Sequence, residues 1–317
     1  MMDDVSAAGP RGGETRPVWV SLGELDLLGA GGEPVDLKRT LASHGVATLP
    51  PQTVDVPACT LETTLARGNG AASTLRIRRG TPGRVAVEIL SERLRVSDRR
   101  HLLSLARHVL SLDRDLSGFY RLAAKDPALN WVVGGAGRML RSPSVFEDVA
   151  KTICTTNCTW SATIRMVTSL VEHLGERAPE GRRSFPGPTA MAAAGEDFYR
   201  EVARAGYRGA YLLRLATDVA EGRLDLEVLN DPEIPDAEVS KRLLALPGVG
   251  PYAMAHVMLI SLGRHGQLIL DSWTRPTYAR LTGRKASDRT IERRFRRYGA
   301  YSGLAFWMFL TKGWVDD

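Results

Sequence analysis

The 317-residue sequence is poor in cysteine, with Cys59, Cys154 and Cys158 as its only thiols. Three unevenly spaced cysteines do not build a disulfide framework or a four-cysteine iron–sulfur site, so we expect no such cluster and a reducing compartment. The sequence also lacks an apolar run long enough to span a membrane, and its first 17 residues have neither an apolar core nor a basic amphipathic pattern. We expect a cytoplasmic protein, nucleoid-associated if bacterial, with a disordered segment at residues 1–17.

Positive charge is in modest excess, since 42 Lys and Arg face 36 Asp and Glu for a formal net charge of +6. This balance favours polyanionic partners, although it also keeps an ordinary surface solvated. A hydrophobic content of 44% supports a substantial core. A chain of this length ordinarily forms about two domains.

The first part of the chain alternates between polar and apolar residues in short runs separated by glycine turns, as in TLETTLARGNG, STLRIRRGTPG and RVAVEILSE. This pattern predicts an antiparallel meander. The flanking segments DLKRTLASHG and SDRRHLLSLARHVLSL have helical spacing, and Ser97 and Asp98 are suited to cap the second. Residues 18–113 are therefore predicted to form a small α+β domain around an antiparallel sheet.

From about Asp115 onward helical spacing dominates, as in DAEVSKRLLAL, YAMAHVMLISLG, SDRTIERRFRRYG and GLAFWMFLTKGW. In SPSVFEDVAKTICTTN we expect Ser142 to be the N-cap, with Pro143 in the first turn and acidic Glu147 and Asp148 close behind. We predict a larger, all-helical domain over residues 114–317, which makes the fold class of the chain α+β.

One stretch, LPGVGPYAMAHVMLISLGRHGQLILDSWTR at residues 246–275, combines two features that bear on function. Gly248 and Gly250 allow a sharp turn between two helices, which exposes backbone N–H groups beside a helix N-terminus and favours phosphate binding. The alternative is a helical turn whose glycines serve only as a C-cap. Small and apolar residues on both sides of the turn favour a helix-hairpin-helix motif that grips the DNA backbone without reading sequence.

The second feature is Asp271, which follows the apolar residues 268–270 and precedes a further helical segment. A lone aspartate in such a position is often a helix N-cap. An ionised carboxylate in a dry cleft also stabilises the positive charge that a departing base leaves on deoxyribose. The two roles are compatible.

Together these residues resemble the helix-hairpin-helix (HhH-GPD) DNA glycosylases of base-excision repair, especially 3-methyladenine DNA glycosylase II, with segments similar to 8-oxoguanine glycosylases. The resemblance runs from about Arg138 to Trp314 through RMLRSPSVFEDVAKTICTTNCTWSATIRMV, SFPGPTAMA, AGYRGAYLLRLA and YGAYSGLAFWMFL. It implies that Asp271 is the catalytic aspartate and that a monomer binds double-stranded DNA containing a damaged base. The implied DNA-binding hairpin consists of Leu246, Pro247, Gly248, Val249 and Gly250.

Position 252 bears on the reaction type. In family members that also cleave the abasic strand, a lysine stands 19 residues (271 minus 252) before the aspartate and forms a Schiff base with the sugar, whereas this sequence has Tyr252. A phenol cannot form that imine, and neither Lys241 nor Lys312 matches the position. The resemblance therefore implies a monofunctional N-glycosylase without AP-lyase activity.

The residues around the expected base pocket bear on the substrate. Asn157 matches an asparagine that contacts the base opposite the lesion in 8-oxoguanine enzymes, but the arginine and glutamine expected with it are replaced by Ala162 and Phe306. Those losses remove directional hydrogen bonds that a guanine reader needs. Aromatic faces stack on a flipped base and attract cationic ones, so we expect alkylated purines such as 3-methyladenine or 7-methylguanine, with two or three of the rings belonging to the core. The pocket aromatics are Trp160, Tyr252, Trp273, Phe306 and Trp307.

Further contacts with DNA follow from the resemblance. Tyr207 and Arg208 resemble a loop that wedges into the duplex, with an ordinary helix entry as the alternative. Arg275 opens a basic run in which some side chains should reach phosphates, the others being a solvated helix face. The rest of that run is Arg280, Arg284, Lys285, Arg289, Arg293, Arg294, Arg296 and Arg297.

The remaining expectations concern metals and histidines. By the resemblance, the backbone carbonyls of Leu244, Leu246 and Val249 hold a monovalent cation, K⁺ or Na⁺, and no cofactor is required. His256 and His265 are interpreted as packing or surface residues.

Two other functions stay open. The first is a glycosylase for an oxidised, deaminated or mismatched base. The second is a non-catalytic helix-hairpin-helix protein that binds distorted DNA, in which Asp271 is only a helix cap.

Overall fold

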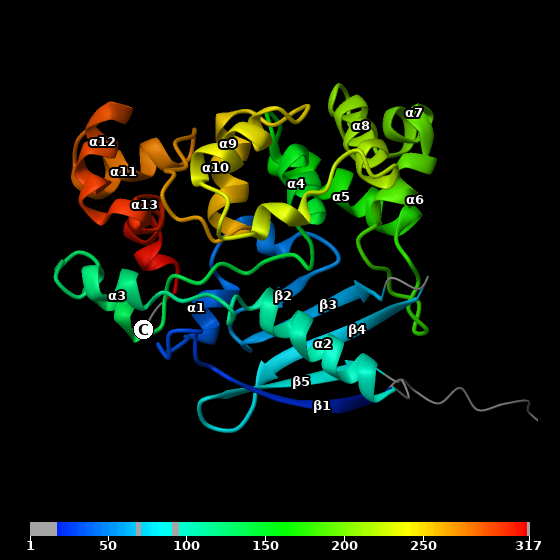
Figure 1. Ribbon diagram of the computed structural model, residues 1–317, viewed down its shortest axis with the longest axis horizontal. Helices are drawn as coiled ribbons and strands as arrows, with labels where there is room; N and C mark the ends of the chain where they lie inside the picture. The colour runs from blue at the N-terminus through cyan, green and yellow to red at the C-terminus, as the bar shows by residue number, and fades with distance from the viewer. Residues whose placement is uncertain (1–17, 68–70, 91–94, 316–317) are drawn as a thin grey trace, which may run out of the picture.

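The computed structural model describes residues 18–67, 71–90 and 95–315. A five-stranded antiparallel sheet in the order β1-β5-β4-β3-β2 is followed by a mostly helical region (Figure 1), which confirms the predicted α+β fold class. The strands are β1 (Trp19–Asp26), β2 (Thr53–Asp55), β3 (Thr60–Ala66), β4 (Ala72–Arg79) and β5 (Arg84–Leu90). The segment predicted to be disordered, residues 1–17, lies outside the described residues.

The three central strands, β3 to β5, form the predicted meander. The hydroxyls of Thr64 and Thr74 lie 2.8 Å apart across β3 and β4, and Glu88 of β5 accepts hydrogen bonds from Arg76 and Arg78 of β4. The two edge strands are additions that the sequence pattern did not predict. A register shift between Ser21 and Gly23 interrupts the alternation of β1, and β2 has only three residues.

The helices build the rest of the structure, with α2 lying across one face of the sheet in Figure 1. Buried Leu102, Ala106 and Val109 of α2 share a hydrophobic cluster with residues of the sheet. None of the helices in the described residues is long and apolar enough to cross a membrane. The helices are α1 (Leu37–Leu41), α2 (Val96–Val109), α3 (Ser117–Ala123), α4 (Val145–Thr155), α5 (Trp160–Leu174), α6 (Pro188–Ala193), α7 (Gly195–Asp197), α8 (Arg208–Ala220), α9 (Asp236–Leu244), α10 (Pro251–Ile260), α11 (Thr274–Thr282), α12 (Asp288–Phe295) and α13 (Ser302–Thr311).

Two predicted helix starts are wrong. The N-cap of α4 is Ser144, whose hydroxyl accepts a hydrogen bond from the Glu147 N–H at 3.2 Å, so Ser142 and Pro143 lie before the helix. Both serines precede the helical pattern, and only Ser144 stands three residues before an unpaired N–H of the first turn. Helix α2 begins at Val96, which places Ser97 and Asp98 inside its first turn rather than at its cap.

Helix α10 lies between the two hydrophobic clusters of the helical region. Ala253, Val257 and Met258 pack with α4, α5 and α8, whereas Leu259 and Ile260 pack with α3, α11 and α13. Because α10 is buried on both sides, its N-terminal end is fixed relative to the neighbouring loops.

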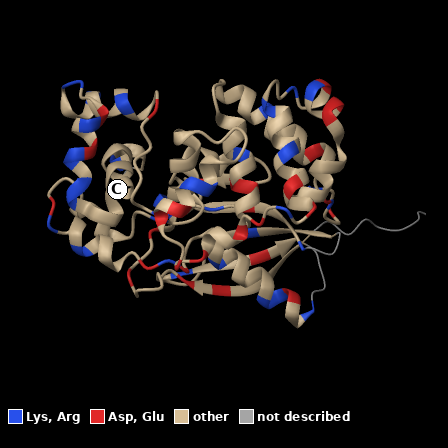
Figure 2. Cartoon of the chain, turned by 45° about the horizontal axis from the view of Figure 1, so that its top comes forward, with Lys and Arg blue, Asp and Glu red and all other residues tan. Residues whose placement is uncertain are grey.

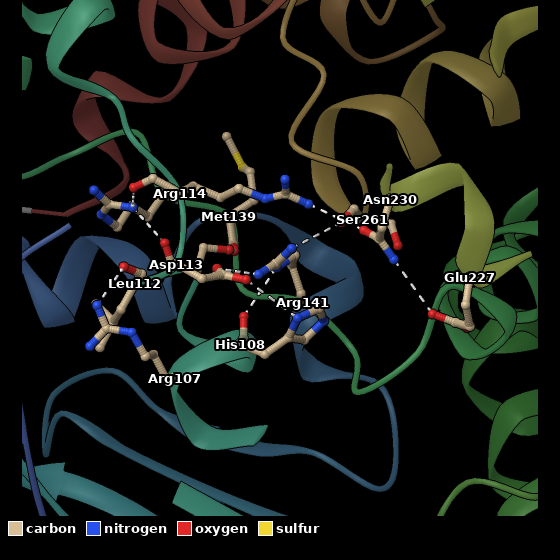
Figure 3. A network of polar contacts seen from close by, with 12 residues as sticks. Arg107, His108, Leu112, Asp113, Arg114, Met139, Arg141, Glu227, Asn230 and Ser261 are labelled. Atoms are coloured by element: carbon tan, nitrogen blue, oxygen red, sulfur yellow. Dashed lines mark hydrogen bonds and ion pairs between the residues drawn. The ribbon is translucent and has the colours of Figure 1, made fainter. Parts of the chain in front are cut away.

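Polar contacts join the sheet region to the helical region (Figure 3). The guanidinium of Arg141, buried at 1% side-chain exposure, donates to Asp113 and to the carbonyls of His108 (3.0 Å) and Ser261 (3.4 Å). Arg114 reaches the side chain of Asn230 at 3.2 Å. These bonds tie the segment after α2 to the loops around α9 and α10.

Candidate functional site

A cavity of about 700 Å³ opens where four loops of the helical region meet. It is lined by residues 155–158 after α4, Tyr207 and Tyr211 at the start of α8, residues 248–253 at the start of α10, and residues 270–272 before α11. Segments more than a hundred residues apart in the sequence therefore share one site. The cavity brings together the predicted residues Asn157, Tyr207, Gly248, Val249, Gly250, Tyr252 and Asp271.

The predicted hairpin is present as α9, a turn at residues 245–250, and α10. Gly248 has φ +81°, and a Cβ atom there would lie 2.6 Å from Cδ2 of Tyr211, so both backbone and space require glycine. Gly250 precedes α10 in an extended conformation and Pro251 occupies its first turn. The unpaired N–H groups of this N-terminus thus lie at the cavity, where an anion would be stabilised.

The carbonyls predicted to hold a cation belong to the same turn. The Leu246 carbonyl accepts a hydrogen bond from the Val249 N–H at 3.1 Å, which makes the turn compact. Leu244 ends α9 and Val249 is buried. Cation binding by these carbonyls remains a prediction.

Asp271 is half-buried at the cavity and organises the start of α11. Its Oδ1 accepts hydrogen bonds from the Trp273 N–H at 2.9 Å and the Thr274 N–H at 2.6 Å, and its own N–H donates to the Thr274 hydroxyl at 2.8 Å. The cap role that the sequence left open is therefore formed, although the assigned N-cap position is Trp273. These bonds hold the carboxylate in one orientation while the residue still lines the cavity.

Tyr252 occupies the first turn of α10 and also lines the cavity. Its hydroxyl lies 3.4 Å from the Thr155 hydroxyl. Burial raises the pKa of Tyr252, and the negative charge of Asp271 adds to this effect. Tyr252 is therefore a neutral phenol at physiological pH, close enough to Asp271 to sense its charge.

Asn157 and Tyr207 lie together at the rim of the cavity. The Asn157 amide donates to the Tyr207 hydroxyl at 3.2 Å, and Asn157 has φ +46°, a conformation that asparagine tolerates better than most residues. Tyr207 is 52% exposed, with its ring edge-on to Tyr211 at 5.7 Å between centroids. This exposed ring is suited to contact a bound ligand.

Arg208 was predicted to bind DNA, and the structure places it elsewhere. Its side chain is buried and its guanidinium donates to the backbone carbonyl of Thr156, with the Nε bond at 2.8 Å. A further bond reaches the carbonyl of Ala205. Arg208 therefore fixes the turn that carries Asn157, and it is not available at the surface as a phosphate ligand.

Several predicted pocket aromatics are core residues. Phe306 has no exposed surface and packs against Phe295 and Tyr278, while Trp307 is 6% exposed and donates its indole N–H to the Ser43 carbonyl at 2.8 Å. The predicted pocket role is wrong for Phe306, because α13 is buried on nearly every side and this ring lies in the core. We had expected two or three of the five predicted rings to belong to the core.

The other two tryptophans are exposed but do not line the cavity. Trp160 begins α5 and contacts Gly45 near the sheet region, where a Cβ would lie 3.7 Å from the indole. Trp273 stands two residues after Asp271 and packs edge-on against Trp314, with 5.4 Å between ring centroids. Of the five predicted rings, Tyr252 alone lines the cavity.

Basic residues are frequent on α11 and α12, which lie on the left of the view in Figure 2. Arg275 forms two bonds to Asp288, at 2.8 and 3.0 Å, and both residues are exposed. Arg294 lies over the Phe309 ring at 4.4 Å, and Arg297 pairs with Asp126. Part of the run is therefore engaged within the protein, whereas Arg280, Arg284, Lys285, Arg289, Arg293 and Arg296 are exposed.

Several residues of the site were not predicted from the sequence. Tyr211, Thr155 and Cys158 line the cavity, and the spacing of Tyr207 and Tyr211, one helical turn apart, is a signal for the first of them. Outside the cavity, Lys151 of α4 was not predicted either; it has no exposed side-chain surface and pairs with Glu147 at 2.7 Å. Their i, i+4 spacing on α4 indicates that pair, but not its burial.

Both histidines adjoin packed regions, as expected. Burial lowers the pKa of His256 to about 3, and it lowers the pKa of His265 to about 3 with a further contribution from Arg114. The His265 ring stacks on Tyr301 with 6.0 Å between centroids.

No family model matches the chain. Among solved structures, the 3-methyladenine DNA-glycosylase from Archaeoglobus fulgidus superposes with a TM-score of 0.71 at 20% identity, over 91% of this chain and 97% of that one. The chain has the fold of this glycosylase. The apo-form of Clostridium acetobutylicum 8-oxoguanine glycosylase/lyase superposes with a TM-score of 0.66 at 19% identity, over 88% of this chain and 94% of that one.

A curated relative is similar over a shorter segment. The Bacillus subtilis (strain 168) protein named "Putative DNA-3-methyladenine glycosylase YfjP" is 26% identical over 121 residues. The match spans 38% of this chain and 41% of the length of that relative. The sequence likeness is therefore partial, whereas the structural likeness covers nearly the whole chain.

Proposed function

We propose that the protein is a monofunctional DNA glycosylase that removes an alkylated purine from double-stranded DNA. The observation that carries this proposal is the cavity, in which the carboxylate of Asp271 and the hairpin before α10 lie together. A backbone anion site beside an oriented carboxylate suits a ligand that combines a phosphate with a sugar centre that becomes positive. The fold shared with two named glycosylases, and the partial sequence match to a relative named as a glycosylase, support the same interpretation.

The N–H groups at the start of α10 hold a phosphate of the damaged strand, aided by the helix dipole. With the strand held there, the damaged nucleotide rotates out of the duplex toward the cavity. The exposed Tyr207 ring, hydrogen-bonded to Asn157, is placed to occupy the space that the nucleotide leaves. Arg208 contributes indirectly because it fixes the turn that carries Asn157.

Asp271 acts on the sugar. As the C1′–N bond breaks, its electron pair leaves with the base and positive charge develops at C1′ and the ring oxygen, which an ionised carboxylate stabilises. A water molecule then adds to C1′ and loses a proton, giving an abasic site and the free base. The two backbone N–H groups bound to Oδ1 keep the carboxylate from rotating away from this position.

An alkylated purine fits this set of groups. The base of an N3- or N7-alkylated purine nucleotide carries a positive charge and leaves as a neutral molecule, so no strong general acid is required. Tyr252 supplies an aromatic face at the cavity, which attracts a cationic base. An oxidised purine is the second candidate, favoured by the structural likeness to 8-oxoguanine glycosylase/lyase and by Asn157 at the cavity rim.

The absence of a lyase step follows from the residue at position 252. Tyr252 is a neutral phenol and forms no imine with the sugar. The buried amine on α4, Lys151, is paired with Glu147 and does not line the cavity. Displacement by water, which leaves the strand intact, is therefore the proposed outcome.

A set of duplexes, each with one defined lesion, tests the proposal. We expect release of free 3-methyladenine or 7-methylguanine, with strand breaks only after alkali treatment. Preferential release of 8-oxoguanine would mean that the proposed substrate class is wrong and that the proposed base-release reaction is right. Binding of distorted duplexes with no base released from any lesion would instead support the non-catalytic alternative.

A further inference from the structure

His256 has an environment that packing alone does not explain. It lies on α10 one turn after Tyr252, and it is 6% exposed. Neither of its ring nitrogens has a hydrogen-bond partner among the residues that the structure describes. Leaving a buried polar group unsatisfied destabilises the folded state, so a phenylalanine would be more stable at this position if the side chain only filled space.

The neighbouring histidine shows the contrast. His44, from the segment after α1, has its ring 6.2 Å from that of His256, edge to face. Its Nε2 donates to the Leu140 carbonyl at 2.7 Å and its Nδ1 accepts from the Ala47 N–H at 3.2 Å. Because both nitrogens of His44 are engaged by the backbone, that ring is positioned without any contribution from His256.

The position of His256 relative to the cavity indicates what it could bind. Tyr252 and His256 are four residues apart on one helix, so their side chains lie on the same side, with 5.6 Å between ring centroids. Tyr252 lines the cavity that holds Asp271, and His256 lies one turn farther along α10, behind the residues that line the cavity. The Tyr252 hydroxyl lies 3.4 Å from the Thr155 hydroxyl, which is a long contact for a hydrogen bond.

We propose that His256 forms a hydrogen bond to the flipped purine once the base has entered past the Tyr252 ring. This inference rests on the proposed glycosylase function and adds a residue that recognises the base. A neutral imidazole offers one N–H donor and one acceptor nitrogen. The acceptor fits an exocyclic amino group of the purine, and it does so without repelling a cationic alkylated base.

The protonation state of the ring suits this role. Burial, with a smaller contribution from the nearby His44, lowers the pKa of His256 to about 3, so the ring stays neutral at physiological pH. The acceptor lone pair is thereby kept available.

Substitution of His256→Phe separates recognition from packing. The variant keeps a ring of similar size and removes two unsatisfied polar atoms, so we expect its melting temperature to rise by about 2–4 °C. The same variant should lose kcat/KM for base release by roughly tenfold, the effect of one hydrogen bond in the bound complex. A residue needed only for packing would not give these opposite changes.

Two further variants complete the test. His256→Gln restores a donor and an acceptor, and we expect it to recover part of the excision that His256→Phe loses. His265 is another histidine whose pKa is lowered by burial, but it does not line the cavity. His265→Phe should therefore leave kcat/KM for base release unchanged.

The outcomes distinguish this inference from the proposed function. If the wild type releases base while His256→Phe is equally active, or is less stable than the wild type, the role of His256 is wrong and the glycosylase function stands. If the wild type releases no base from any lesion, the proposed function fails and this inference fails with it.

Discussion

The ring of Tyr211 lies directly against the hairpin at Gly248, where an added Cβ would be 2.6 Å from Tyr211 Cδ2. Gly248 also has φ +81°. We therefore expect Gly248→Ala to destabilise the protein by about 1–3 kcal/mol and to weaken binding to duplex DNA, because the turn and Tyr211 must both shift. Urea unfolding and fluorescence anisotropy with a labelled duplex measure the two effects.

Gly250→Ala is the matched control for that substitution. Gly250 has φ −92° and nothing lies within 4 Å of a Cβ built on it. Its unfolding free energy should stay within about 0.5 kcal/mol of the wild type. Equal losses in the two variants would mean that the contact with Tyr211 is not what requires glycine at position 248.

Tyr207 and Arg208 are adjacent but should respond differently to alanine substitution. Tyr207→Ala removes an exposed ring, so we expect little change in stability and a loss of excision on the order of tenfold, because the flipped nucleotide loses its replacement in the duplex. Arg208→Ala should cost roughly 1.5–3 kcal/mol of stability through the lost bonds to Thr156. Thermal melts alongside single-turnover excision separate the two. A stable, inactive Arg208→Ala protein would show that Arg208 contacts DNA after all.

Position 252 offers a gain-of-function prediction. The wild type should form no covalent adduct with damaged DNA in the presence of borohydride, because Tyr252 cannot form an imine. In Tyr252→Lys, burial of the new amine favours its neutral, nucleophilic form, so a trapped adduct should appear. Denaturing gels detect the adduct. Trapping by the wild type would contradict the monofunctional assignment.

Asp113 links stability to pH. Burial alone would raise its pKa, but the polar contact with His108 at 3.6 Å and the charge and hydrogen bond of Arg141 outweigh burial and hold the pKa of Asp113 below its ordinary value. The contribution of Asp113 is therefore present above the unfolded pKa of about 4 and is lost as pH falls below it. We expect Asp113→Asn to lower the unfolding free energy at pH 7 and to differ less from the wild type near pH 3.

Asp26→Asn is the control for this pH dependence. Asp26 pairs with Arg84 while both side chains are more than half exposed, so its removal should change little at either pH. Chemical unfolding series at the two pH values give the comparison. If the difference in unfolding free energy between wild type and Asp113→Asn is as large near pH 3 as at pH 7, the proposed link between Asp113 and pH-dependent stability is wrong.

The sequence was informative where local pattern determines structure. Residues 246–251 combine two glycines with two prolines, and those residues alone specify a tight turn into α10. Asp271 is likewise recognisable in the sequence, because it ends an apolar run immediately before a helix. The meander of β3 to β5 follows from the alternation of polar and apolar residues. Strand β1 was not predicted, because its register shift near Gly23 breaks this alternation.

Side-chain direction was harder to predict. Arg208 and Tyr207 are neighbours in sequence, yet one turns inward to the Thr156 carbonyl and the other remains at the surface. Phe306 belongs to a helix with apolar residues on nearly every side, so nothing in its pattern distinguishes core from pocket. The unsatisfied nitrogens of His256 depend on long-range packing around α10 and carry no sequence signature.

The most direct test of the account is base release by Asp271→Asn. An asparagine Oδ1 can still accept the two N–H bonds that begin α11, so the variant should fold and bind DNA as the wild type does. Loss of the negative charge should lower single-turnover release of 3-methyladenine from methylated duplex by at least about a hundredfold. Release at the wild-type rate by a folded Asp271→Asn protein would contradict the central claim.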